Sequence, residues 1–376
     1  MRILFVSQCY PSPDSPQYGI FIKQQENALR ELGHQVDVLM PAPTGKDGQV
    51  QQREDGTYTL TYRTLRYDVF PLLCSPKARK SIRSLIQTNG YDLVAVHITD
   101  DGILKMVVDA CDKCGTKVVA HYHGLNVWEE YTTIHPHRQK LYAARRLRIL
   151  KRTHGVVGVS NKVRDIVGSR LKNVPLQTVY NGVDVELFRQ SCPEEGVFRV
   201  IGVGNLIEIK GFAYLLEAFS KLHNKYPHTR LDIVGDGVLR DSLQEKARML
   251  GIEKAVTFHG KVPYDRVAEL MQKSHLFVLP SFYEALGCVY LEAMGCGLPT
   301  IGIKGMGIDE IIVHGENGLL AEPKNSQDLF EKMYQVATDP ALQEDLARCG
   351  EKTAREYTWA ASGKALEDFY KECVKQ

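Results

Sequence analysis

Two glutamates eight residues apart, Glu284 and Glu292, have the type and spacing best suited to chemistry in this sequence. Both lie in the stretch from Pro280 to Gly297, which reads PSFYEALGCVYLEAMGCG. The pattern predicts the end of an apolar strand, a turn, and then a helix whose one charged residue is Glu292. Because an unpaired carboxylate on a buried apolar helix costs on the order of several kcal/mol, Glu292 is expected to have a polar partner.

The start of this helix adds an anion site between the two carboxylates. Backbone N–H groups around Leu286, Gly287 and Cys288 carry partial positive charge and can bind a phosphate. An anion site flanked by two hydrogen-bond acceptors suits a sugar joined to a nucleoside diphosphate. Each glutamate also has a plainer interpretation, Glu284 as a solvated loop residue and Glu292 as a buried structural acid.

Lys210 is a second candidate for contact with the phosphates. It follows a glycine-containing loop between a predicted strand and a predicted helix, GVGNLIEIKG. A lysine there can neutralise a diphosphate that leaves as an anion, so the chemistry is expected to need no metal ion and no cofactor. Asn205 on the same loop offers hydrogen bonds but no charge. A solvated surface lysine is the alternative.

The central stretch, with its two glutamates and the run EAMGCGLPTIG, resembles the signature of the retaining family-4 glycosyltransferases. The resemblance implies an α/β protein with the GT-B fold, in which two Rossmann-like doubly wound domains face each other across a cleft. It implies that Glu284 contacts the transferred sugar and that Glu292 holds the ribose hydroxyls of the nucleotide. It also implies backbone contacts to the base from Gly260 to Val262. Relatives usually have arginine at the position of Asn205, so this chain has one positive charge fewer there.

Two histidines, His121 and His123, follow a predicted buried strand in the first half of the chain. Catalytic groups in open α/β sheets gather where strands end, and alternate residues of an extended segment share a face, so both imidazoles can point into the cleft. His123 with Gly124 matches the HG-type pair of the family, which helps to position the donor sugar. The role of His121 stays open.

Gly19 lies before the first predicted helix, in QYGIFIKQQ. Relatives usually have a glycine pair at this point, where the backbone approaches the diphosphate or the acceptor. A simple turn glycine is the alternative, because glycine adopts positive φ angles without steric cost.

The alternation of strands and helices restarts once along the chain, which predicts two doubly wound domains. A length of 376 residues suits two domains of ordinary size. We expect residues 1–188 to form the acceptor domain, completed by a C-terminal helix at about residues 358–376. Residues 189–357 are expected to form the nucleotide-sugar donor domain, after a linker at residues 190–196, QSCPEEG.

The composition places the chain among soluble globular proteins, with 44% hydrophobic and 24% charged residues. A net charge of +2 gives no overall positive field for nucleic acid. Nine scattered cysteines fit reduced thiols better than a disulfide framework. Neither an apolar leader nor a membrane-spanning run is evident, so a cytoplasmic protein is expected.

A basic segment at residues 138–152, RQKLYAARRLRILKR, predicts an amphipathic helix. Four arginines are expected on its exposed surface: Arg145, Arg146, Arg148 and Arg152. Such a surface can bind an anionic membrane or an anionic acceptor, which would place the protein peripherally on the inner face of the membrane. A merely solvated face is the alternative.

Taken together, the resemblance implies a hexosyltransferase-type retaining glycosyltransferase. It would move a sugar from a nucleoside-diphosphate sugar, with UDP the commonest carrier in the family, to a sugar, lipid-linked or polysaccharide acceptor of the cell envelope. No carboxylate is an evident nucleophile, which favours same-face displacement over a covalent intermediate. Two rival functions are a nucleotide-sugar 2-epimerase on the same fold and a non-catalytic partner subunit.

Overall fold

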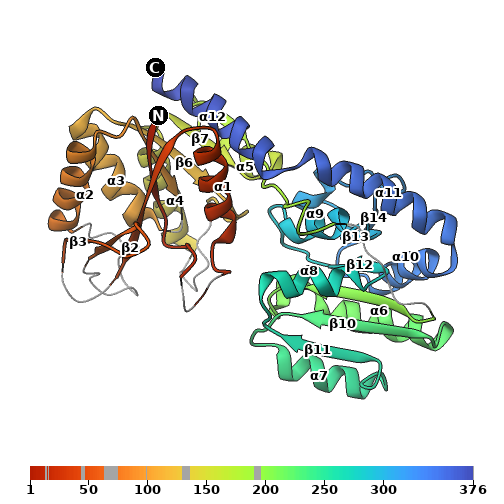
Figure 1. Cartoon of the computed structure of the whole chain (residues 1–376). Helices are drawn as coiled ribbons and strands as arrows, with labels where there is room; N and C mark the ends of the chain where they lie inside the picture. The colour runs from red at the N-terminus through yellow and green to blue at the C-terminus, as the bar shows by residue number, and fades with distance from the viewer. Residues whose placement is uncertain are drawn as a thin grey trace. The chain divides into compact units, whose positions relative to one another are not determined.

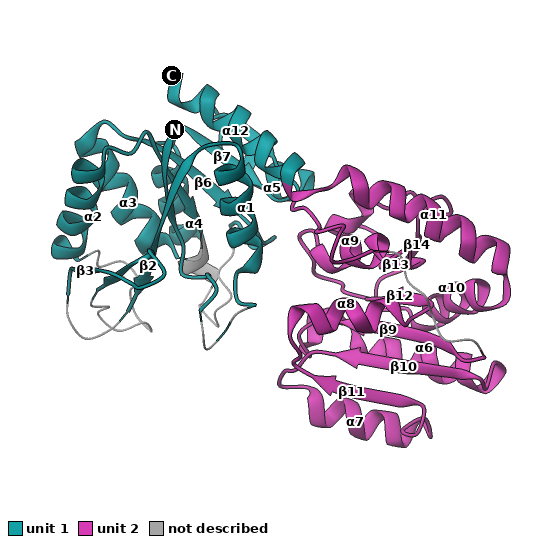
Figure 2. Cartoon of the chain, in the orientation of Figure 1, with its two compact units in different colours: residues 1–180, 360–376 teal, residues 181–359 magenta. Residues whose placement is uncertain are grey.

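The computed structural model describes residues 1–12, 15, 17–43, 47–62, 75–98, 100–128, 136–189 and 196–375. The chain divides into two compact units, Met1–Tyr180 with Ala360–Gln376 and Asn181–Trp359 (Figure 2). Each unit is a sheet of mostly parallel strands covered by helices, which confirms the predicted α/β class with two doubly wound domains.

The first unit is built on a sheet with the strand order β3-β4-β2-β1-β5-β6-β7-β8. Its strands are β1 (Arg2–Val6), β2 (Gln35–Ala42), β3 (Gln49–Gln52), β4 (Tyr58–Thr61), β5 (Leu93–His97), β6 (Lys117–Tyr122), β7 (Gly155–Gly158) and β8 (Leu176–Thr178). All neighbours pair in parallel except β3 with β4. The short apolar runs of β1, β5 and β6 are buried because helices cover both faces of a parallel sheet.

Six helices of the described chain accompany this sheet (Figure 1). They are α1 (Ile20–Glu31), α2 (Pro76–Asn89), α3 (Asp101–Cys114), α4 (Pro136–Leu150), α5 (Asn161–Gly168) and α12 (Trp359–Lys375). The C-terminal helix α12 packs Leu366, Phe369 and Tyr370 into the same apolar cluster as β1 and α1. The predicted C-terminal helix therefore completes the first unit, although it is encoded after the second.

The second unit has a parallel sheet with the strand order β11-β10-β9-β12-β13-β14. Its strands are β9 (Phe198–Val203), β10 (Thr229–Val234), β11 (Val256–Gly260), β12 (Leu276–Val278), β13 (Thr300–Ile303) and β14 (Leu319–Ala321). Its helices are η1 (Glu208–Lys210), α6 (Phe212–Lys225), α7 (Arg240–Met249), α8 (Tyr264–Gln272), α9 (Cys288–Gly295), η2 (Gly307–Glu310), α10 (Ser326–Thr338) and α11 (Pro340–Glu356), where η marks a 3-10 helix. The order departs from β9 in both directions, so the ends of β9 and β12 lie side by side at a topological switch point.

The division between the units falls at Tyr180 and Asn181, earlier than the predicted boundary at residue 188. The physical reason is that residues 182–188 already pack on the second unit. Val183 N–H donates to the Tyr357 carbonyl at 2.9 Å, and the ring of Phe188 contacts that of Tyr264 edge to face. Of the predicted linker, residues 190–195 lie outside the described residues.

A helix that spans a membrane must be both long and apolar. Among the residues that the structure describes, no helix is both long and apolar enough to cross a membrane.

Candidate active site

The start of α9 lies at the carboxyl end of β12, as the sequence predicts. Its N-cap is Gly287, with φ at +82°, and no side chain of the described residues caps this end of the helix. A Cβ on Gly287 would lie 2.7 Å from the ring of Tyr290 and 3.2 Å from Cγ of Glu284, so only glycine fits the turn. The N-cap residue therefore gives the first N–H groups of α9 no side-chain hydrogen bond, and this end carries the positive end of the helix dipole.

The loop before α9 is fastened to η1. Phe282 N–H donates to the carbonyl of Ile209 at 3.0 Å, and the hydroxyl of Ser281 donates to the same carbonyl at 3.1 Å. Because of these bonds Lys210, at the end of η1, lies next to Glu284. The Lys210 ammonium forms an ion pair with a Glu284 carboxylate oxygen, and the two side chains are only 19% and 14% exposed.

Gly307 in η2 supports the other side of this loop. Its N–H donates to the backbone carbonyl of Glu284 at 3.0 Å. A Cβ on Gly307 would lie 1.8 Å from the carbonyl oxygen of Ala285, so the two backbones approach more closely than any larger residue would allow. The backbone of Glu284 is thus held by η2, and its side chain is held by Lys210 at the end of η1.

Glu292 points into the interior from the middle of α9 and is 7% exposed. The hydroxyl of Tyr264 on α8 donates to its carboxylate at 2.6 Å, which confirms the expected polar partner. Burial raises the pKa of Glu292 to about 7, and the Tyr264 hydrogen bond offsets part of that rise. Sequence reasoning missed Tyr264 because it lies 28 residues earlier, and only the packing of α8 against α9 brings the two together.

Three further nucleotide-binding candidates, Asn205, Gly260 and Val262, lie at the same carboxyl edge of the sheet. Asn205 follows β9 and is exposed, and a Cβ on the preceding Gly204 would lie 3.9 Å from Cδ of Lys210. Asn205 and Lys210 thus lie on one short loop. The aliphatic part of the Lys210 side chain folds back over the start of that loop, at Gly204.

Gly260 ends β11 with φ at +70°, and its carbonyl accepts a hydrogen bond from Gly235 N–H at 2.8 Å. The half-buried Val262 follows shortly after it. A Cβ on Gly260 would lie 3.1 Å from the guanidinium of Arg240, which is itself paired with Asp236 at 3.2 Å. Arg240 is a cation at this edge that the sequence analysis did not single out, since one arginine on a surface helix gives no signal.

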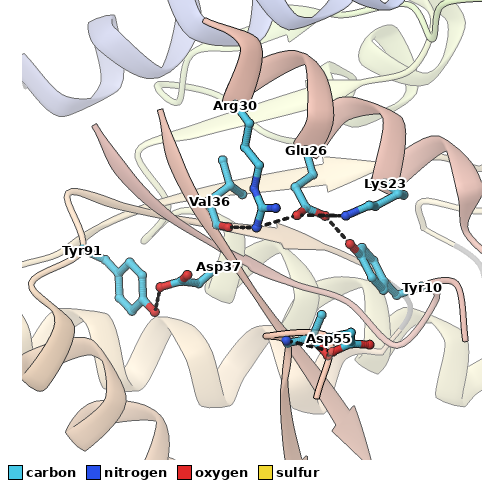
Figure 3. Close-up of polar contacts among 9 residues, drawn as sticks. Tyr10, Lys23, Glu26, Arg30, Val36, Asp37, Asp55 and Tyr91 are labelled. Carbon is cyan, nitrogen blue, oxygen red and sulfur yellow. Dashed lines mark hydrogen bonds and ion pairs between the residues drawn. The ribbon is translucent and has the colours of Figure 1, made fainter. Parts of the chain in front are cut away.

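In the first unit, Gly19 precedes α1 with φ at +74°. A Cβ there would lie 2.5 Å from the carbonyl of Cys9, so glycine is required by the turn itself. Figure 3 shows how the neighbouring helix is held: the buried Glu26 accepts a hydrogen bond from Tyr10 and pairs with Lys23 and Arg30. The backbone at Gly19 packs closely against the backbone of Cys9, which explains why this turn has a glycine.

His123 lies directly after β6 and belongs to a group of three imidazoles. His97, the last residue of β5, pairs in register with His121 on β6, so the two side chains share one face of the sheet. His97 Nδ1 lies 3.0 Å from His123 Nε2, and His121 Nε2 lies 2.7 Å from the hydroxyl of Tyr370. Burial lowers the pKa of all three, that of His123 to about 4, so all three are neutral at pH 7.

The open question about His121 is answered by its position. His121 is fully buried and bonded to Tyr370 of α12, whereas His123 is partly exposed. His123 is therefore the less buried member of the pair, and His121 belongs to the interior. Sequence reasoning missed His97 as a partner, although a polar residue that ends a buried strand was a usable signal.

Comparison with known proteins assigns the chain to a family. Residues 19–187 match the profile described as Glycosyltransferase Family 4, and residues 184–355 match that described as Glycosyl transferases group 1. The chain belongs to the family-4 glycosyltransferases. The glycosyltransferase assigned by resemblance is thus confirmed.

Curated relatives cover nearly the whole glycosyltransferase. It is 26% identical to an uncharacterized glycosyltransferase of Methanocaldococcus jannaschii, over 99% of this chain and 98% of the relative. It is also 26% identical to N-acetyl-alpha-D-glucosaminyl L-malate synthase of Bacillus anthracis, over 92% of this chain and 90% of that one.

Solved structures confirm the GT-B fold. Sucrose-phosphate synthase from Thermosynechococcus elongatus superposes with a TM-score of 0.79 at 19% identity, covering 100% of this chain and 99% of its own. Anabaena HepE in complex with UDP and glucose superposes with a TM-score of 0.76 at 20% identity, covering 99% and 100%.

The described part of this glycosyltransferase offers one group of three side chains that could hold a metal ion, the same three histidines. One nitrogen of each lies within 4.8 Å of the others. A tetrahedral zinc ion with Zn–N bonds of about 2.0–2.1 Å needs nitrogens roughly 3.3 Å apart. His97 and His123 instead direct nitrogens at each other at hydrogen-bond distance, so their lone pairs are not aimed at a common point.

One of the predicted surface arginines of the glycosyltransferase is placed differently. Arg146 was expected on the exposed face of its helix, and this is wrong: it is buried at 9% exposure. Its guanidinium bonds the carboxylate of Asp101 at 2.6 Å and donates to the carbonyl of Val127. The cause is Asp101 itself, a buried acid in the first turn of α3 that needs a cation.

Proposed function

We propose that this protein transfers a glycosyl group from a nucleoside-diphosphate sugar to an acceptor hydroxyl, with retained anomeric configuration. The observation that carries the proposal is the Lys210–Glu284 ion pair beside the uncapped start of α9. A cation and free N–H groups suit a diphosphate, and an adjacent carboxylate suits a sugar hydroxyl.

Each candidate residue takes a role that its surroundings support. Lys210 and the N–H groups at Leu286, Gly287 and Cys288 bind the diphosphate, and Glu284 accepts hydrogen bonds from the transferred sugar. Glu292 accepts hydrogen bonds from the ribose hydroxyls while Tyr264 holds its carboxylate in place.

Five further residues belong to the proposed site. Backbone at Gly260 and Val262 contacts the base, at the edge where β11 ends. His123 is proposed to contact the donor sugar. Asn205 hydrogen-bonds the phosphates, and Gly19 keeps the first unit's loop in the conformation that its close backbone contacts require.

The reaction that fits these groups is a same-face displacement. The bond between the anomeric carbon and the diphosphate oxygen breaks, and its electron pair stays on the phosphate. The acceptor oxygen forms the new bond to the anomeric carbon, and its proton passes to the departing phosphate oxygen. Lys210 and the α9 dipole stabilise the negative charge that develops on the leaving group, which needs no metal ion in this scheme.

The donor and acceptor classes are proposed by analogy. The structure of HepE, which shares this fold, was solved with UDP-glucose, so UDP is the proposed carrier and a hexose the proposed sugar. The names of the relatives indicate different acceptors, since they include glycogen synthase and D-inositol 3-phosphate glycosyltransferase. We propose a polysaccharide or glycolipid acceptor of the cell envelope.

Contact with an anionic membrane would depend on fewer arginines than the sequence suggests. Arg146 is removed from the surface by Asp101, and Arg152 pairs with Asp109 at 2.9 Å and with Asp112 at 2.5 Å. Arg148 is exposed on the same helix as Arg146. Sedimentation with anionic and neutral vesicles tests this part separately from the chemistry.

The deciding experiment is a thermal-shift screen of UDP-, GDP- and ADP-sugars, because preferential binding raises Tm. A UDP-sugar should give the largest shift, and the Lys210→Ala variant should show a smaller one. Turnover with an acceptor panel then gives the product, whose anomeric configuration is read by NMR.

Three outcomes would overturn the proposal. A product of inverted configuration contradicts retention, and an epimerised donor formed without any acceptor points to a 2-epimerase. Donor binding with neither transfer nor hydrolysis, across a broad acceptor panel, points to a non-catalytic subunit.

A further inference from the structure

Three histidines of the first unit form a chain of contacts that begins at Tyr370 of α12. Tyr370, His121, His97 and His123 follow one another, with Tyr370 OH 2.7 Å from His121 Nε2 and His97 Nδ1 3.0 Å from His123 Nε2. Between these two bonds, the rings of His97 and His121 lie with centroids 4.6 Å apart. We call this group the imidazole chain.

His97 and His123 meet end to end. Their ring planes differ by 7° and their centroids are 5.2 Å apart. The nitrogen–nitrogen distance of 3.0 Å plus the two ring radii accounts for almost all of that separation. The contact is therefore an N–H to N hydrogen bond near the plane of both rings, in which one imidazole donates and the other accepts.

The direction of the chain is set at Tyr370. Its hydroxyl is fully buried, and His121 is its one hydrogen-bond partner in the described part of the chain. A phenol O–H is a stronger donor than a neutral imidazole N–H, and an imidazole nitrogen is a stronger acceptor than a phenol oxygen, so Tyr370 donates to His121 Nε2. Neutral His121 then carries its proton on Nδ1.

The same direction continues through His97. His121 Nδ1 and His97 Nε2 are both buried and have no hydrogen-bond partner among the described residues. Because the rings of His97 and His121 are in contact, with centroids 4.6 Å apart, a second unpaired N–H at His97 Nε2 would bring two like dipoles close together. His97 Nε2 is therefore the bare acceptor when His121 Nδ1 carries a proton. His97 therefore carries its proton on Nδ1 and donates it to His123 Nε2.

We infer that Tyr370, His121 and His97 are positioning residues that hold His123 as the Nδ1-protonated imidazole, so that it presents an N–H donor to its ligand. His123 Nδ1 is a buried atom with no partner among the described residues, and it belongs to the one ring of the three that is partly exposed. A sugar hydroxyl oxygen is the class of acceptor that fits it. The identity of this ligand rests on the proposed function, whereas the proton position does not.

The direct test is the proton position in the ligand-free protein. Long-range ¹H–¹⁵N spectra of protein with ¹⁵N-labelled histidine show which ring nitrogen carries hydrogen, and loss of one signal set in His123→Phe assigns His123. We expect Nδ1–H for His123 and for His97 at pH 7. An Nε2–H tautomer or a charged imidazole at His123 would overturn the inference, whether or not the protein transfers sugar.

Variants of His97 separate positioning from packing. Asparagine places an amide N–H where His97 has Nδ1–H, so His97→Asn should keep the His123 tautomer and most of the activity. His97→Phe keeps a ring but has no donor, so His123 should become a tautomer mixture and kcat/KM should fall by about 10-fold or more. Equal losses in both variants, with an unchanged His123 signal, would show that His97 only fills space.

Tyr370→Phe tests the far end of the chain. It should shift the His121 and His97 signals and redistribute the His123 tautomers. The matched control is Tyr91→Phe, which removes a hydroxyl bonded to Asp37 at 2.6 Å in the same unit and should leave the histidine signals unchanged. A Zn²⁺ titration completes the set: if Zn²⁺ shifts His97, His121 and His123 together at one equivalent, a metal site replaces the imidazole chain.

Discussion

The carboxyl edges of the two sheets carry opposite kinds of polar group. In the second unit the edge holds charges, with Lys210 paired to Glu284 and the acid Glu292 behind them. In the first unit the edge holds the neutral imidazoles of His97, His121 and His123. Both edges are mostly buried. Burial alone therefore does not decide whether their polar groups are charged or neutral, and the neighbours of each group do.

The two edges differ in how they offset the energetic cost of burying polar groups. Lys210 and Glu284 form an ion pair, so each charge has its counterion at contact distance. Among the described residues the imidazoles have no acidic partner, so burial favours their uncharged forms and they bond one another or Tyr370. A charged edge suits a substrate part that gains charge during reaction, and a neutral edge suits hydroxyl groups that do not.

The largest expected effect is that of Lys210→Ala. Without the ammonium, charge developing on the leaving diphosphate loses its nearest cation, and kcat should fall by on the order of 10²-fold or more. Nucleotide affinity should fall much less. Steady-state kinetics and calorimetry measure the two effects.

Lys246→Ala is the matched control for Lys210, since Lys246 also pairs with a glutamate, Glu217, within the same unit. It should leave kcat nearly unchanged. Unchanged kcat in Lys210→Ala would remove the charged edge from the mechanism.

Glu292→Gln tests whether the buried acid is held at a cost in stability. The pKa of Glu292 is about 7, above its unfolded value, so its favourable contribution to folding is complete below the unfolded pKa and is lost as pH rises through 7. Glutamine can still accept the Tyr264 bond but carries no charge. The variant should therefore be more stable than the wild type at pH 8, by roughly 2 kcal/mol, and gain little at pH 5.

Chemical denaturation at the two pH values measures this difference. Glu217→Gln is a control of opposite sign, because Glu217 has a lowered pKa through the hydrogen bond and charge of Lys246 despite partial burial. It should lose stability at pH 8. A wild type that is more stable than Glu292→Gln at pH 8 would contradict the raised pKa.

His123→Phe probes the neutral edge. Loss of one neutral hydrogen bond to the sugar should lower kcat/KM by about 10-fold, less than the loss expected for Lys210→Ala. Phenylalanine keeps the ring contact that His123 makes with Phe21 at 4.7 Å between centroids, so the fold should be retained. A loss larger than that of Lys210→Ala would reverse the comparison of the two edges.

Asn205→Arg is expected to have the smallest effect. Asn205 is exposed on the loop that carries Lys210, and arginine there adds a second positive charge near the proposed diphosphate. If the missing charge limits the chemical step, kcat should rise, by up to about 10-fold. A fall in kcat would indicate that another cation, such as Arg240, already serves this purpose.

Much of the architecture could be predicted from local sequence. Short apolar runs at residues 93–97, 199–203 and 231–234 specify buried parallel strands, and they correspond to β5, β9 and β10. The turn before α9 was also predictable, because a glycine between a strand and an apolar helix has few other uses. These features depend on residues close together in the chain.

Other predictions failed or were incomplete where distant contacts decide. The unit boundary moved to residue 180 because residues 182–188 pack on the second unit, and Arg146 turned inward because Asp101, 45 residues earlier, lies buried beside it. The periodicity of the sequence predicts neither contact.

The sequence by itself determined the two doubly wound units, the start of α9 and the chemical types at the proposed donor site. Only the tertiary structure decided which partners these groups have: Tyr264 for Glu292, Glu284 for Lys210, and the imidazole chain behind His123. The reason is physical. Backbone conformation responds to neighbours a few residues away, whereas the charge and proton position of a buried group depend on side chains that folding brings from far along the chain.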